Sequence, residues 1–212
     1  MTTRGTYIAF EGLEGCGKST HVTRLAEKIN AVATREPGGT RIGALLRGIL
    51  ADPENTDLNS RTELLLMTAD RAQHMSELIE PTLQRGQHVV SDRSVYSTLA
   101  YQGYGRGLDI DTLLSINTWA LNNVLPDIVV WIQISTEEAN TRLAKRDLDR
   151  FEREGADFFA RIGAGFAELA AKDPTRWILI DGLEPKDVVE EKIFAAVVAH
   201  PSFTLHSWAM PW

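Results

Sequence analysis

Short runs of consecutive apolar residues alternate along the chain with longer stretches in which apolar residues recur every three or four positions. The short runs predict buried strands at residues 7–10, 31–34, 88–91, 127–135 and 177–180. The helical spacing predicts helices over residues 21–30, 42–50, 63–83, 111–123, 137–146, 157–171 and 186–199. Continuous apolar strands that alternate with helices are typical of a parallel sheet covered on both faces. The pattern therefore predicts an α/β fold with three layers, in which helices flank a five-stranded parallel sheet.

Length and composition fit one domain over residues 1–212, because no linker, repeat or low-complexity tract interrupts the pattern. The tail over residues 200–212 has no helical or strand period, and its two tryptophans either pack on the body or form a contact. A net charge of -7 argues against a general nucleic-acid partner. We find no secretory signal and no apolar run long enough for a membrane span. The single cysteine, Cys16, cannot form an internal disulfide, so we expect a cytoplasmic protein.

The first predicted strand runs into a phosphate-binding pattern. GLEGCGKS fits G-x-x-x-x-G-K-[ST], with a strand before it and a helix after it. Glycines let successive backbone N–H groups face phosphate oxygens, the lysine reaches the β- and γ-phosphates, and the serine hydroxyl suits Mg²⁺. The pattern predicts a P-loop NTPase fold. The expected ATP-binding residues are Gly12, Gly15, Cys16, Gly17, Lys18, Ser19 and Thr20. Neither N-K-x-D nor L-S-G-G-Q is present, which argues against a GTPase and a transporter ATPase.

Polar groups follow other predicted strands, and in an open α/β sheet ligands bind at that edge. Arg35 and a Pro-Gly-Gly turn follow the second strand. Asp92 and Arg93 follow the third. An acidic residue there suits the Mg²⁺ shell, so Ser19 and Asp92 are the expected metal residues. Arg93 is placed to grip an acceptor phosphate, and residues 97–103 combine polar and aromatic groups as a nucleoside pocket would.

Arginines gather between residues 142 and 154. Arg142, Arg146, Arg150 and Arg153 would lie near one face if the helix continued through them. Most charged runs are solvated surface. Phosphoryl transfer, however, needs cationic charge on the moving group, and a closing lid would supply it while excluding water.

These residues together resemble bacterial thymidylate kinases over about residues 7–181. FEGLEGCGKST, TREPGGT, ADRAQH, the stretch from DRS to AYQG, and LDRFE carry the resemblance. It implies transfer of the γ-phosphoryl group of ATP to dTMP, giving dTDP, with Mg²⁺. It also implies an arginine-rich lid over about residues 142–154 and a homodimer. Lys18 and Arg93 are then expected catalytic residues. Because the P-loop interior lacks an arginine, the resemblance also implies that lid arginines stabilise the transition state, with Arg146 and Arg150 as the candidates and Arg142 next.

The resemblance also implies roles around dTMP. Arg93 and Arg47 would contact the phosphate, Arg71 the thymine edge, and Tyr101 the sugar near C2′. Glu14 would accept a hydrogen bond from the 3′-OH, and the peptide bond before Pro37 would be cis. Many relatives carry a Phe or Tyr where this chain has Met67 and Thr68, so Met67 would cover the base here. The full expected dTMP set is Glu14, Pro37, Arg47, Met67, Arg71, Arg93, Ser97, Thr98, Tyr101 and Gln102.

Alternatives stay open at this point. The acceptor could be another nucleotide or a deoxynucleoside, or the chain could bind nucleotides without catalysis. Glu14 could be a solvated residue on the outside of the loop. The apolar positions of residues 111–123 fit either the core or an interface.

Overall fold

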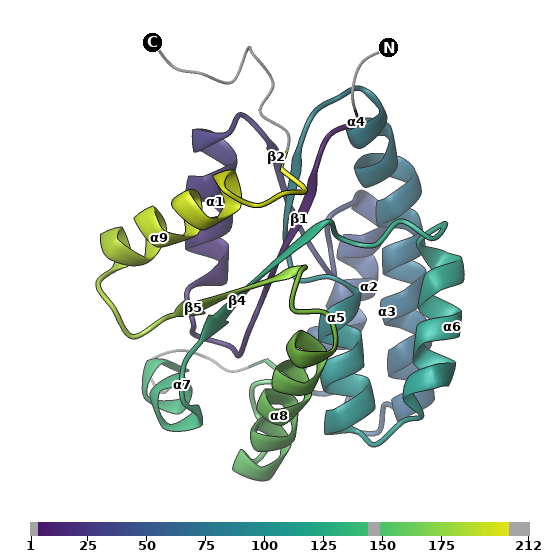
Figure 1. Ribbon diagram of the computed structural model, residues 1–212. Helices are drawn as coiled ribbons and strands as arrows, with labels where there is room; N and C mark the ends of the chain where they lie inside the picture. Colours follow the sequence, from purple (N-terminus) through teal and green to yellow (C-terminus); the bar gives the residue numbers. More distant parts are fainter. Residues whose placement is uncertain (1–3, 144–148, 204–212) are drawn as a thin grey trace.

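The computed structural model describes residues 4–143 and 149–203. Five strands form one parallel sheet in the order β2-β3-β1-β4-β5 (Figure 1). They are β1 (Tyr7–Glu11), β2 (Val32–Arg35), β3 (Val89–Asp92), β4 (Ile128–Gln133) and β5 (Trp177–Asp181). The predicted α/β architecture is confirmed. Because β1 is central, the loop after it lies in the middle of the sheet's carboxyl edge.

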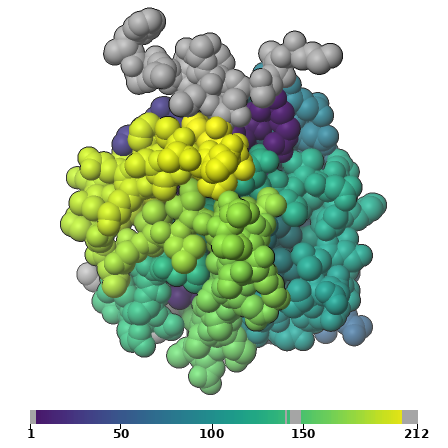
Figure 2. Space-filling model, in the orientation of Figure 1, coloured from purple at the N-terminus to yellow at the C-terminus, as the bar shows by residue number. Residues whose placement is uncertain are grey.

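Helices cover both faces of the sheet (Figure 1). They are α1 (Lys18–Lys28), α2 (Arg41–Ala51), α3 (Ser60–His74), η1 (Met75–Ile79), α4 (Glu80–Gln84), α5 (Val95–Thr98), η2 (Leu99–Gly105), α6 (Ile110–Ala120), α7 (Thr136–Leu143), α8 (Ala156–Lys172) and α9 (Lys186–Val198). The elements η1 and η2 are π-helical. Figure 2 shows that α8 and α9 form much of one face of the molecule.

The two faces of the sheet carry separate apolar clusters, because successive strand side chains point to opposite sides. Ile8 and Phe10 pack with residues of α1 and α9, including Leu25. Tyr7 packs in the other cluster, with residues of α3, α6 and α8, including Phe166. All of these side chains are buried. This two-sided core fixes the sheet and leaves its carboxyl edge to the loops.

Two local predictions need correction. The helix expected over 63–83 begins at Ser60 and contains the π-helical segment η1 before α4. Arg150 and Arg153 do not continue a helix. They lie in a turn in which Asp149 accepts hydrogen bonds from the backbone N–H groups of residues 151 and 152, a local arrangement that competes with helix formation.

The described part of the tail packs on the body. The Phe203 ring stacks on His88 with 4.9 Å between centroids, and Thr6 donates a hydrogen bond to the carbonyl of Ser202. Residues 204–212, with both tail tryptophans, lie outside the described residues. Within the described ranges, no helix is long and apolar enough to cross a membrane.

Candidate active site

The loop after β1 has the backbone geometry that its glycines allow. Gly12, Gly15 and Gly17 all have positive φ angles, of 139°, 75° and 96°. A Cβ atom on Gly12 would lie 2.5 Å from the Ile132 carbonyl oxygen, so a side chain is excluded there. The loop ends at the start of α1, where backbone N–H groups and the helix dipole favour an anion. This is the predicted phosphate-binding loop.

Lys18, the first residue of α1, lies along the loop. Its Nζ atom donates hydrogen bonds to the carbonyl oxygens of Gly12, at 3.0 Å, and Leu13, at 2.7 Å. The side chain is buried. The ammonium group is thus held within the loop whose amides would surround the phosphates.

Ser19 and Asp92 meet at the carboxyl edge of the sheet. The Ser19 hydroxyl donates to a carboxylate oxygen of Asp92 at 2.5 Å. Mg²⁺ prefers oxygen ligands and binds through one or two protein oxygens together with phosphates and water. The donor set at this position fits Mg²⁺.

A cavity of about 340 Å³ opens beside the loop. All ten residues predicted for the dTMP site line it, and so do Lys18, Ser19 and Asp92. Its walls come from the P-loop, the turn after β2, α2, α3, α5 and η2, and from Asp149, Phe151 and Glu152. The sequence therefore identified residues from separate elements that the fold brings to one cavity. The predicted cis peptide bond between Glu36 and Pro37 is also present.

Glu14 lies inside this cavity as part of an ion pair. Its carboxylate accepts hydrogen bonds from Arg93, at 2.6 Å, and from the Tyr101 hydroxyl, at 2.5 Å. Burial alone would raise the pKa of Glu14, but the charges of Arg93 and Lys18 and the Tyr101 hydrogen bond lower it below its ordinary value. Glu14 is therefore an ionised acceptor that faces the cavity, which disfavours the solvated alternative.

Positive charge gathers where an acceptor phosphate is expected. Arg35, Arg47 and Arg93 all line the cavity. Burial, and then the nearby charge of Arg35, lower the pKa of Arg47, and Arg93 adds to the effect. Guanidinium groups that repel one another in a partly buried site favour a bound anion.

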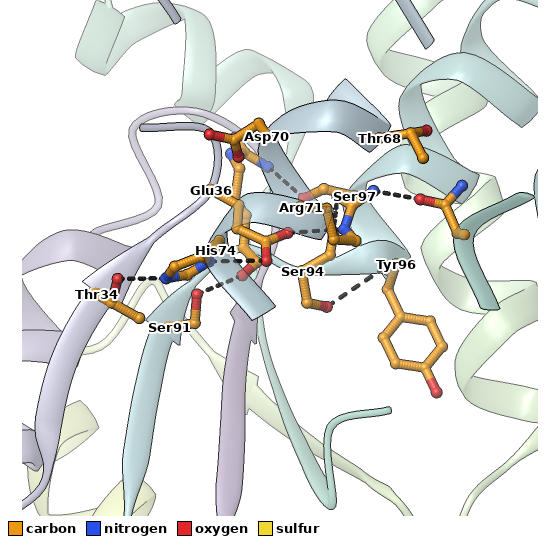
Figure 3. A network of polar contacts seen from close by, with 12 residues as sticks. Thr34, Glu36, Thr68, Asp70, Arg71, His74, Ser91, Ser94, Tyr96 and Ser97 are labelled. Carbon is orange, nitrogen blue, oxygen red and sulfur yellow. Dashed lines mark hydrogen bonds and ion pairs between the residues drawn. The ribbon is translucent and has the colours of Figure 1, made fainter. Parts of the chain in front are cut away.

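Arg71 is fixed in a buried polar network (Figure 3). Its Nε atom donates to Glu36 at 2.8 Å, and its other nitrogens donate to Asn117 and to the backbone carbonyl of Ser94. Glu36 also pairs with His74 at 3.0 Å. Burial would raise the pKa of Glu36, but Arg71 and His74 lower it. These hydrogen bonds fix the Arg71 guanidinium, which lines the cavity, in one orientation.

The predicted catalytic arginines occupy different places. Arg142 donates to the Gly15 carbonyl at 3.2 Å and, together with Cys16, lines a second cavity of about 310 Å³ that also borders the loop. Arg150 is buried and lines neither cavity, and it pairs with Glu63 at 2.6 Å and donates to the Leu50 carbonyl. Arg146 lies outside the described residues.

Sequence reasoning missed several polar residues of the site. Glu11 is fully buried at the end of β1 and accepts hydrogen bonds from the hydroxyls of Ser94 and Ser97. Glu63 is buried in the first turn of α3, where acidic residues are common because of the helix dipole. His74 is hidden behind Glu36. Each of these residue types is common at its position in a strand or helix. The local sequence therefore gives no sign of a special role, and only the tertiary contacts show it.

Comparison with known proteins gives consistent matches. The family model for thymidylate kinase matches residues 10–193. The thymidylate kinase of Solidesulfovibrio magneticus is 42% identical over 204 residues, covering 90% of this chain and 98% of the relative. The thymidylate kinase of Desulforudis audaxviator is 40% identical, covering 92% of this chain and 91% of the relative. That of Pelotomaculum thermopropionicum is 41% identical, covering 91% of this chain and 93% of the relative.

Proposed function

Since the chain belongs to the thymidylate kinase family, we propose that the cavity beside the P-loop is where dTMP accepts the γ-phosphoryl group of ATP to give dTDP. One observation carries the proposal. The residues expected to contact dTMP come from separate elements and line a single cavity that begins at the P-loop. The donor and acceptor sites therefore adjoin, as direct transfer between two nucleotides requires.

The donor lies along the P-loop. Its amides and Lys18 bind the phosphates, and Ser19 and Asp92 would hold Mg²⁺. Mg²⁺ held there would supply positive charge that offsets the charge of the donor phosphates. The second cavity, next to Gly15 and Arg142, takes the nucleoside of the donor, since it shares the P-loop residues Gly15 and Gly17 with the acceptor cavity and none of the residues proposed to contact dTMP lines it.

The acceptor is held at three points. Arg93 and Arg47 bind its phosphate, in the part of the cavity where positive charge gathers. Glu14 accepts a hydrogen bond from the sugar 3′-OH, and its low pKa keeps it an acceptor. Arg71, Thr98 and Gln102 contact the base, Met67 covers it, and Tyr101 lies by the sugar. The acceptor oxygen is already anionic near neutral pH, so the protein needs no strong general base.

Residues 142–154 act as the lid. Closing it over the phosphates excludes water and brings guanidinium charge to the transferring group. Of the predicted lid arginines, Arg142 lies next to the P-loop, since its Nη1 atom is 3.2 Å from the Gly15 oxygen.

The functional unit is a homodimer in the cytoplasm. Apolar side chains are exposed on α3 and α6, which lie side by side (Figure 1): Leu65 is 58% exposed, Leu114 is 39% exposed and Trp119 is 79% exposed. An exposed apolar group of this kind, on two adjacent helices of which α3 also lines the acceptor cavity, fits a second copy of the chain. The alternative that residues 111–123 lie wholly in the core is disfavoured by Trp119.

A panel of acceptors tests the function. The purified protein is given ATP and Mg²⁺ with dTMP, other nucleoside monophosphates or thymidine, and nucleotide products are separated by chromatography. We expect dTDP as the main product. A preference for thymidine over dTMP would identify a nucleoside kinase, and absence of any phosphorylated product would identify a protein that only binds nucleotides.

A further inference from the structure

Glu63 joins three parts of the molecule around one buried carboxylate. It lies in the first turn of α3 and is 1% exposed. One oxygen accepts hydrogen bonds from the Gln102 amide nitrogen, at 2.8 Å, and from Arg106 Nε, at 3.3 Å. The other accepts from Arg106 Nη2, at 3.3 Å, and pairs with Arg150 Nη2, at 2.6 Å. None of the motifs in the sequence includes this residue.

The two arginines hold the carboxylate in place. Arg106 also pairs with Glu154 at 2.5 Å and lies over the Phe158 ring, and Arg150 is fixed by the Leu50 carbonyl. The charges of the two carboxylates and two guanidinium groups balance. A buried carboxylate that is satisfied on both oxygens has little freedom to move.

Gln102 is oriented by this carboxylate. A side-chain amide has one donor end and one acceptor end, whereas an ionised carboxylate only accepts hydrogen bonds. The NH₂ group of Gln102 donates its hydrogen bond to Glu63, and Gln102 also lines the cavity. The carbonyl oxygen of the amide is therefore the group available to a ligand in the cavity. The opposite orientation would set the carbonyl oxygen against the carboxylate, with no proton between them.

We propose that Glu63 is a positioning residue that sets base selectivity by fixing the carbonyl end of Gln102 toward the acceptor base. The inference rests on the proposed function. Thymine and uracil carry a proton on N3, which a carbonyl oxygen accepts, whereas N3 of neutral cytosine is itself an acceptor. Glu63 therefore favours acceptors with an N3–H group and acts against cytosine nucleotides without touching them.

Steady-state kinetics with dTMP, dUMP and dCMP test the proposal. In Glu63→Gln the substituted amide can donate as well as accept, so Gln102 can turn and present its NH₂ group to the cavity. We expect the ratio of kcat/KM for dTMP over dCMP to fall by about tenfold, the effect of one unpaired buried group. The ratio for dTMP over dUMP stays constant, because both bases carry N3–H. A general loosening of the site would change both ratios together.

Glu154→Gln is the matched control, since it removes the outer partner of Arg106 and leaves Gln102 and Glu63 in contact. It should keep both ratios. Gln102→Leu gives a second test that does not depend on the folding of the Glu63 variant, and it should lower the dTMP-to-dCMP ratio by a similar factor. Unchanged ratios in Gln102→Leu, or parallel changes for dUMP and dCMP in Glu63→Gln, overturn the inference. Failure of the wild-type protein to phosphorylate dTMP would instead refute the proposed function.

Discussion

Replacing Glu11 by Gln is expected to remove a loss of stability that occurs as the pH rises. Glu11 is fully buried at the end of β1, and its oxygens accept hydrogen bonds from Ser94, at 2.7 Å, and Ser97, at 2.5 Å. Burial raises its pKa from 4.5 to about 7, against the opposing effects of the Arg93 charge and the two hydroxyls. Hydroxyl groups donate and accept, so they also satisfy the amide of the variant.

The direction of the effect follows from proton binding by Glu11. Between pH 4.5 and about 7 the folded protein retains a proton on Glu11 that the unfolded chain has released. The free energy of unfolding therefore falls across this window. The contribution of Glu11 is complete below pH 4.5 and is lost as the pH rises through about 7. Since each pKa unit corresponds to about 1.4 kcal/mol, the loss is about 3 kcal/mol.

Urea unfolding at a series of pH values measures this difference. The free energy of unfolding of Glu11→Gln minus that of the wild type should grow by about 3 kcal/mol between about pH 4.5 and about pH 7.5. Glu27→Gln, on the exposed side of α1, is the control and should follow the wild type at every pH. A difference between Glu11→Gln and wild type that stays constant with pH would refute the reasoning, because it would mean that Glu11 is equally ionised in both states.

Four further substitutions test the proposed roles. Lys18→Ala should lower kcat by about 10²-fold or more while circular dichroism shows an intact fold, and near-normal turnover would contradict its role. Glu14→Ala should raise KM for dTMP by about tenfold with little change in the Kd for ATP, whereas the reverse pattern would place Glu14 at the donor. Arg142→Ala should lower kcat by about 10²-fold, and an unchanged kcat would leave it only a binding role. Trp119→Glu should shift the protein from dimer to monomer in sedimentation, and a variant that stays dimeric would exclude the α3–α6 face as the interface.

The parts of the site that could be predicted from sequence are those governed by local chemistry. The glycine spacing around Lys18 dictates a loop conformation, and β1 and α1 flank it as the motif requires. Asp92 and Arg93 follow a strand, and parallel strands share a carboxyl edge, so their meeting with the P-loop followed from topology. The roles of Arg47, Met67 and Arg71 came from the family resemblance, and all three residues line the cavity.

The supporting polar residues could not be predicted, because their meaning depends on burial and on distant partners. In the sequence, Glu11 is simply a polar residue at the end of a strand. In the structure it is buried and accepts hydrogen bonds from Ser94 and Ser97, which lie 83 and 86 positions further along the chain. Glu63 reads as a favourable charge in the first turn of a helix. The π-helical segments were missed for a related reason: an inserted residue in a helix changes hydrogen bonding without changing the apolar pattern enough to detect.

The contacts of Arg150 bear on which lid arginine stabilises the transferring group. Its guanidinium pairs with Glu63, donates to the Leu50 carbonyl and lies over the Phe151 ring. To reach the phosphates it would have to exchange a buried carboxylate for phosphate oxygens, and Glu63 would then depend on Arg106 alone for charge. Breaking a buried ion pair is costly, because one charge is left without a partner. Arg142 faces no such exchange, since its partner Glu138 is partly exposed and the Gly15 carbonyl already holds it at the P-loop. A static role for Arg150, anchoring residues 149–154 to α2 and α3, therefore costs less than a direct role in the transfer.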